Sequence, residues 1–130
     1  MNTHEKAVQL FTRETLDELF PPERSDDFFD ALYGDAAEGA YDIRLVFRAA
    51  DPKILHFAFE LRRRPGKCLA CNVTYGLPQV FTRHPIINLK GLAEALGGLI
   101  GWDAKEIRFT LGRTEEHSPE LHLIHLSIQR

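Results

Sequence analysis

The sequence lacks the many cysteines, the serine motif and the long apolar runs that mark several classes of protein. Its 130 residues include only two cysteines, too few for a disulfide-rich scaffold. None of its three serines lies in the glycine-flanked pattern of a serine nucleophile. No apolar run is long enough to cross a bilayer, and the N-terminal MNTHEKAVQLF lacks the apolar centre of a signal peptide. We therefore expect a cytoplasmic protein that does not bind membranes.

A surplus of positive charge is also missing. The formal net charge is −3, whereas a dedicated nucleic-acid-binding domain normally carries a basic surplus that neutralises phosphates. We therefore expect no nucleic-acid partner.

What is present fits one ordinary domain. The chain is 44% apolar and 27% charged, which is typical of a soluble globular protein with a single core. No segment is repetitive or of low complexity. We expect a single α+β domain over residues 1–130.

Helical patterns come first along the chain. Apolar residues recur at helical spacing over residues 3–20, and Pro21-Pro22 ends this pattern. Residues 12–15 are a point at which the segment could divide into two helices. Ser25 is typical of a further helix start, and Gly34 is typical of its end.

Three segments with the two-residue period of a half-buried strand follow. They span residues 40–49, 53–63 and 67–75, and Asp51-Pro52 and Pro65-Gly66 supply turn residues between them. We predict an antiparallel meander. The residues of the second segment that are expected to face the core are Leu55, Phe57, Phe59 and Leu61.

The remaining chain predicts one more helix and further strands. A short strand is predicted over 79–83, a helix over 88–100, and two closing strands over 106–112 and 120–129, joined by the polar loop RTEEHSP. The order α-α-β-β-β-(β)-α-β-β defines an α+β fold. It has N-terminal helices and an antiparallel sheet of five to six strands, with one helix packed on a face.

Residues 62–76, RRRPGKCLACNVTYG, raise the question of a metal or redox site. Cys68 and Cys71 could form a zinc site with His122 and His125. Residues three apart on a strand point to opposite faces, however, so each pair would need a turn in order to chelate. A redox Cys-x-x-Cys opens a helix, whereas this one leads into a predicted strand. We favour a hairpin, expect no cofactor and keep zinc as an alternative.

A second candidate site precedes the later helix. Arg83 and His84 lie just before Asn88, the predicted cap of that helix, and a helix N-terminus flanked by cations can hold an anion. A small enzyme or an anion-binding protein centred there is one hypothesis. A plain surface loop is the simpler one.

The face of the sheet that points away from the core is a third candidate. It carries Arg44, His56 and Asn72 among small residues, and the terminal LHLIHLSIQR is apolar on both faces. Such a strand is central in its sheet or is covered by a partner. Our leading hypothesis is a non-catalytic binding module for a protein or a small ligand, which we expect to be a homodimer.

Three stretches resemble a small family of uncharacterised bacterial proteins: FFDALYGDAAEGAYDI, RPGKCLACNVTYGLPQVFTRHPIIN and LKGLAEALGGLIGW. Some members of that family are named pancreas/duodenum homeobox protein. A homeodomain is basic and built of three helices, so the acidic, strand-rich chain does not support that name. The resemblance implies no activity and no site residues.

The predicted element order is also similar to that of secretion-chaperone-like domains. That similarity implies a small, acidic, non-catalytic dimer that binds other polypeptides. It is an analogy of fold alone.

Overall fold

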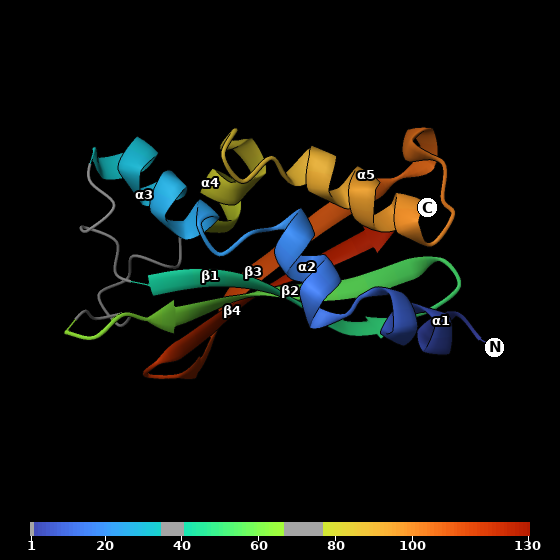
Figure 1. Ribbon diagram of the computed structural model, residues 1–130, viewed down its shortest axis with the longest axis horizontal. Coiled ribbons are helices and arrows are strands. Elements are labelled where there is room, and N and C mark those ends of the chain that lie inside the picture. Colours follow the sequence, from blue (N-terminus) through green and yellow to red (C-terminus); the bar gives the residue numbers. More distant parts are fainter. Residues whose placement is uncertain (1, 35–40, 67–76) are drawn as a thin grey trace.

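A layer of helices covers one face of an antiparallel sheet (Figure 1). The computed structural model describes residues 2–34, 41–66 and 77–130. The helices are α1 (Thr3–Leu10), α2 (Arg13–Leu19), α3 (Arg24–Tyr33), α4 (Leu77–Arg83), α5 (Leu89–Leu99) and the 3₁₀ helix η2 (Ala104–Glu106). The strands are β1 (Tyr41–Ala50), β2 (Ile54–Arg63), β3 (Arg108–Ser118) and β4 (Leu121–Gln129).

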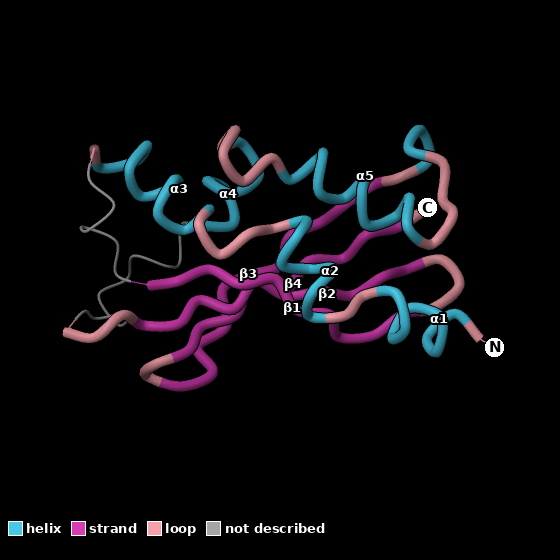
Figure 2. The backbone as a smooth tube through the Cα atoms, in the orientation of Figure 1, coloured by secondary structure: helices cyan, strands magenta, loops and turns pink. Residues whose placement is uncertain are grey.

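The sheet has the strand order β1-β2-β4-β3, and all of its pairings are antiparallel. The tube in Figure 2 shows the helices on one side of these strands. The α+β class is therefore confirmed. The last strand of the sequence, β4, is central, which is one of the two alternatives that its two apolar faces left open.

The predicted count of five to six strands is not confirmed, since the described residues form four. The strand predicted over residues 67–75 lies outside the described residues. The strand predicted over residues 79–83 is wrong, because this segment belongs to helix α4. Leu77 and Phe81 are four residues apart and both buried, which is a helical spacing. Pro78 in the first turn also suits a helix start.

Helix α5 and the end of α3 agree with the sequence. Asn88 occupies the N-cap of α5, and its side chain accepts from the backbone N–H of Gly91 at 3.4 Å. Gly34 ends α3 in the left-handed conformation with φ 78°. The first helical segment divides at Thr12, whose Oγ1 accepts from the N–H of Thr15 at 3.2 Å.

The core between the two layers is aromatic. Phe59, at 0% exposure, lies between Phe20 and Phe81, with ring centroids 5.3 Å away in each case and the rings near edge-on. Such edge-to-face pairs add stability beyond their buried area. The predicted core residues of β2 are all fully buried: Leu55, Phe57, Phe59 and Leu61.

Side chains from the N-terminal helices close the outer edge of β1. Ser25 does not cap α3 as predicted; Glu23 holds that position. The buried Ser25 Oγ instead accepts from the N–H of Ile43 at 2.8 Å and donates to its carbonyl at 3.3 Å. Arg13 donates to the carbonyl of Leu45. Such bonds occupy backbone groups that an edge strand otherwise leaves unpaired.

The final hairpin is longer than the sequence predicted. The polar segment RTEEHSP was expected to be a loop, but β3 continues to Ser118, and Thr114 pairs with Ile124 of β4. Register shifts occur between Leu111 and Thr114 and again near Ser118. These irregularities interrupt the two-residue period and so hide the strand from pattern analysis.

Candidate functional site

The run of arginines at the end of β2 is paired with carboxylates. Arg62 Nη2 lies 3.5 Å from Glu60 Oε2, and Arg63 Nη2 lies 3.8 Å from Glu120 Oε1. We refer to Arg62, Arg63 and Arg64 as the arginine end. Arg62, Arg63 and Glu120 are largely exposed, so each pair contributes little stability, but each places a carboxylate beside its cation.

Arg64 is the most strongly held member of the arginine end. Its Nη2 lies 2.7 Å from Asp26 Oδ1 and 3.0 Å from Asp42 Oδ1. Its guanidinium carbon is 5.3 Å from the centroid of the Phe29 ring, and its side chain is only 17% exposed. Arg64 therefore links α3 to β1 and is not available to a phosphate.

A second group of cations lies at the opposite end of the sheet. It consists of Lys53 in the turn before β2, Lys90 in α5, Lys105 in η2, Arg108 at the start of β3 and Arg130 after β4. We call these five residues the basic end. None of them takes part in the ion pairs found within residues 2–34, 41–66 and 77–130.

The basic end surrounds two adjoining hollows. The helix-side hollow has a volume of about 410 Å³ and lies between α5 and the start of β3. Its lining consists of Lys90, Ala93, Glu94, Ala104, Lys105, Ile107, Arg108 and Phe109. The half-buried Ile107 and Phe109 pack against the core and give this hollow an apolar floor.

The sheet-side hollow is larger, at about 620 Å³, and more strongly charged. Its lining consists of Lys53, Lys105, Glu106, Arg108, Gln129 and Arg130. Arg108 and Gln129 are cross-strand partners, so the hollow lies over the end of the β3–β4 pair. Lys105 and Arg108 line both hollows.

The chain between α5 and β3 positions these side chains. A Cβ at Gly97 would collide with Ile107 Cδ1, so a larger residue at this position of α5 would require the Ile107 side chain to shift. The N–H of Trp102 donates to the carbonyl of Gly97 at 2.9 Å. Asp103 Oδ1 accepts from the N–H of Lys105 at 3.0 Å and so caps η2. The guanidinium carbon of Arg130 stacks 5.6 Å from the Trp102 ring.

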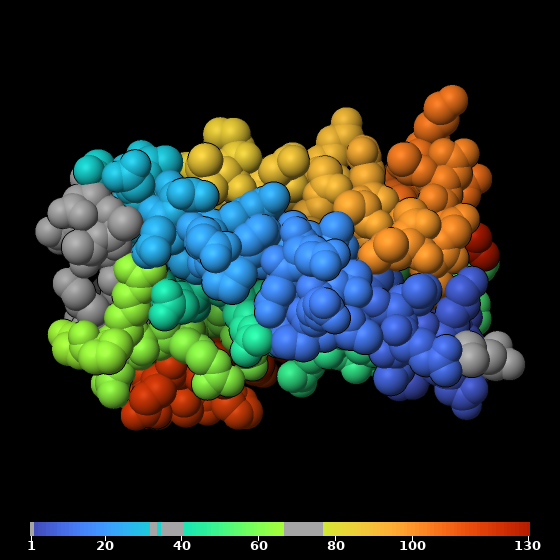
Figure 3. All heavy atoms as spheres, in the orientation of Figure 1, coloured from blue at the N-terminus to red at the C-terminus, as the bar shows by residue number. Residues whose placement is uncertain are grey.

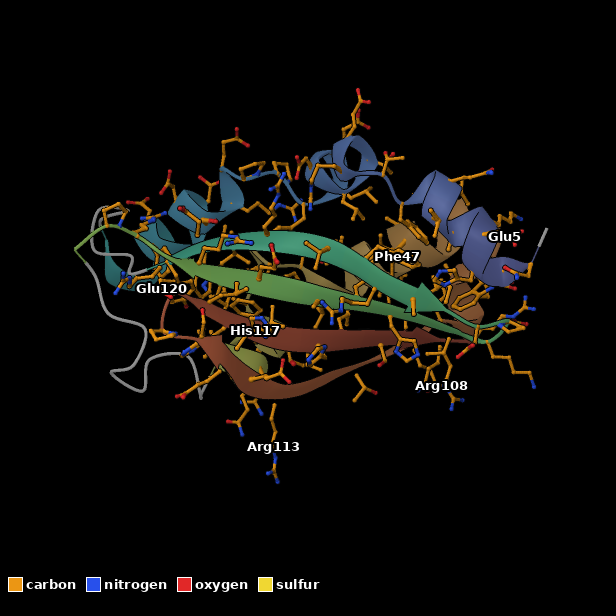
Figure 4. All side chains as sticks on the ribbon, turned by 90° about the horizontal axis from the view of Figure 1, so that it is seen from below. Glu5, Phe47, Arg108, Arg113, His117 and Glu120 are labelled. Atoms are coloured by element: carbon orange, nitrogen blue, oxygen red, sulfur yellow. The ribbon has the colours of Figure 1, made fainter. Side chains whose placement is uncertain are left out.

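The two charged ends are separated along the length of the sheet. Figure 4 shows Arg108 near one end of the sheet and Glu120, the partner of Arg63, toward the other. The helical layer runs along the sheet from one charged end toward the other. Figure 3 shows the N-terminal helices in blue beside α5 in orange on this face. Together the two hollows are lined by five cations and two carboxylates, in a chain with a net charge of −3.

Two of the three residues of the predicted site at Arg83, His84 and Asn88 make contacts within the fold. The His84 ring packs edge-on against Phe28 at 4.9 Å, and its Nδ1 accepts from the N–H of Ile86 at 3.2 Å. The Asn88 amide oxygen caps α5, as described above. Arg83 is an exposed cation in the last turn of α4, where it complements the helix dipole.

Among the predicted site residues of the outer sheet face, Arg44 and His56 lie beside different carboxylates. Arg44 Nη2 lies 3.6 Å from Asp17 Oδ2 of α2, and His56 Nε2 lies 4.0 Å from Asp51 Oδ2 in the turn before β2. Asn72 lies outside the described residues. Near the middle of this face, Leu123 is only 3% exposed.

The histidines of the zinc hypothesis lie on opposite faces of β4. His122 is 2% exposed and pairs across the strands with Leu61, a core residue. His125 pairs with Ala58, and its Nε2 lies 3.5 Å from Glu115 Oε2. Cys68 and Cys71 lie outside the described residues. Within the described part of the chain, no three metal-ligating side chains come together.

Sequence analysis missed the basic end. Its five residues are scattered between positions 53 and 130, so no sequence window contains them together. The only local signal is the spacing of Lys105 and Arg108, which are three residues apart.

Comparison of the chain with protein-family models, with curated proteins and with solved structures finds no match. Among the described residues, no helix combines the length and the apolar character needed to span a membrane. The inference of function therefore rests on the geometry of the site.

Proposed function

We propose that the protein is a non-catalytic module that binds a small polyanion at the basic end. The observation that carries this proposal is the convergence of five cations on two adjoining hollows in an acidic chain. Cations that have no carboxylate partner repel one another, and an anionic ligand relieves that repulsion.

The types of side chain in the lining favour a phosphorylated ligand. Arg108 and Arg130 present guanidinium groups, which donate two parallel hydrogen bonds to phosphate or carboxylate oxygens. Lys53 and Lys105 add ammonium donors to the lining of the sheet-side hollow. A ligand with several negative charges can contact all four cations, whereas a single carboxylate cannot.

The same lining supports binding more than catalysis. The described residues that line the two hollows include no serine, threonine, cysteine or histidine. These are the side chains that most often act as nucleophiles or proton-transfer groups. The two carboxylates, Glu94 and Glu106, lie among cations.

Isothermal titration calorimetry with inorganic tripolyphosphate tests the proposal. The titration uses a metal-free buffer at low salt, where charge interactions are least screened. The variant Lys105→Ala/Arg108→Ala removes the two cations that both hollows share. We expect its affinity to fall by about tenfold or more, since each charged contact contributes roughly 1 kcal/mol.

The matched control is Arg62→Ala/Arg63→Ala at the arginine end. It changes the net charge by the same amount, and we expect its affinity to stay within about twofold of the parent. Equal losses of affinity in the two double variants would show that only the net charge matters and would refute a site at the basic end. The absence of any binding heat with the parent protein would also refute the proposal. Native mass spectrometry of the same samples tests the expected homodimer.

A further inference from the structure

The two hollows of the basic end differ in chemistry. The sheet-side hollow is lined by charged and amide side chains, whereas Ile107 and Phe109 form an apolar floor in the helix-side hollow. Ile107 and Phe109 both line this hollow and are half-buried. A bare polyphosphate gains nothing from an apolar floor, whereas a flat ring gains from covering it.

Glu94 adds a second requirement to the helix-side hollow. Its side chain lines the hollow from α5, beside Ala93 in the sequence, and is half-buried. A carboxylate repels phosphate and accepts hydrogen bonds only. A ligand group placed here therefore needs N–H or O–H donors on its edge. Guanine presents its N1–H and its amino N–H side by side, a pair that one carboxylate accepts together.

We infer that the ligand of the basic end is a nucleoside polyphosphate. The base lies in the helix-side hollow over Ile107 and Phe109, with its donor edge toward Glu94. The phosphate chain crosses Lys105 and Arg108 into the sheet-side hollow. This inference rests on the proposed polyanion-binding function and adds the chemical class of the ligand.

Two other sources of phosphate fit the lining less well. The hydrocarbon chain of a phospholipid offers no donor to the Glu94 carboxylate and would cover the charged side chains of the same hollow with apolar surface, which is costly. A single-stranded nucleic acid needs several stacking side chains along a groove, and Phe109 is the only aromatic residue in the described lining. Both sources are included in the test.

The test compares guanosine triphosphate with tripolyphosphate by calorimetry in a buffer that contains a metal chelator. We expect guanosine triphosphate to bind about tenfold more tightly, because the base adds stacking and two charge-assisted hydrogen bonds. The ratio of the two dissociation constants is the quantity of interest, since changes in general electrostatics affect both ligands and cancel.

The variant Glu94→Ala is expected to bring this ratio close to one. It removes the acceptor for the base and leaves tripolyphosphate binding unchanged or tighter. The matched control is Glu106→Ala, which removes the other lining carboxylate, from the sheet-side hollow. This variant is expected to bind both ligands more tightly and to leave the ratio of the two dissociation constants unchanged. Thermal unfolding by circular dichroism confirms that both variants fold.

The possible outcomes separate this inference from the proposed function. Equal affinities for the two ligands, or an unchanged ratio in Glu94→Ala, would refute the nucleoside part and leave polyanion binding in place. No binding of either ligand would refute both. Tighter binding to vesicles of phosphatidylglycerol or to a single-stranded oligonucleotide than to guanosine triphosphate would also overturn the inference.

Discussion

The arginine end carries three cations and the basic end five, and the fold uses the two groups differently. The arginine end is contiguous in sequence, and its guanidinium groups lie beside carboxylates of α3, β1, β2 and the β3–β4 turn. The basic end is dispersed in sequence and takes part in none of the ion pairs among the described residues. A run of like charges in a sequence is therefore not by itself a binding surface, because the fold decides which charges are neutralised.

The largest effect that would sharpen this comparison is the salt dependence of binding. Binding of a polyanion to exposed cations releases counterions into solution. Because that release is less favourable at high salt, the affinity falls steeply as the salt concentration rises. We expect the affinity for tripolyphosphate to fall by roughly a hundredfold between about 20 and 500 mM sodium chloride. Calorimetry across a salt series measures it. An affinity that is insensitive to salt would show that the basic end does not hold the ligand.

A smaller effect is expected at the arginine end, on stability. Arg64→Ala removes two ion pairs and the stacking on Phe29, and we expect it to lower the free energy of unfolding by about 1–2 kcal/mol. Urea denaturation measures the change. Arg63→Ala is the control, because its single, longer and more exposed pair predicts a change below about 0.5 kcal/mol. Equal changes in both variants would contradict the structural role of Arg64.

The smallest effect is expected from a single cation of the basic end. Lys53→Ala removes a charge that repels its neighbours and has no ion-pair partner in the described residues. We expect the free energy of unfolding at low salt to stay constant or to rise by a few tenths of a kcal/mol. The sign is opposite to that expected for Arg64→Ala. A loss of 1 kcal/mol or more in urea denaturation would mean that Lys53 stabilises the fold.

The sequence predicted those features that depend on a regular period. The alternation in β1 and β2 identified the strands and their core face, and the caps at Gly34 and Asn88 placed the helix ends correctly. Helix α4 was missed because its apolar residues, Leu77 and Phe81, span little more than one turn. The extension of β3 was missed because two register shifts break its period.

The candidate site could not be predicted in the same way. Pattern analysis selected His84 and Asn88 for their chemical types, and in the structure His84 Nδ1 accepts from Ile86 and the Asn88 side chain caps α5. Residue type alone therefore does not separate a structural polar group from a binding one. The basic end depends on the pairing of Arg108 with Gln129 and on the close approach of α5 at Gly97. Both are contacts between segments distant in sequence, and local patterns carry no information about them.

The closed edge of β1 has a consequence for aggregation. His4 of α1 accepts from the N–H of Ala50 at 3.3 Å, and Arg13 of α2 and Ser25 of α3 occupy other backbone groups of this strand. A strand from another molecule would have to displace all three side chains before it could add to the sheet here. Detachment of the N-terminal helices is therefore the step that would expose this edge to fibril growth, and conditions that loosen those helices set the risk.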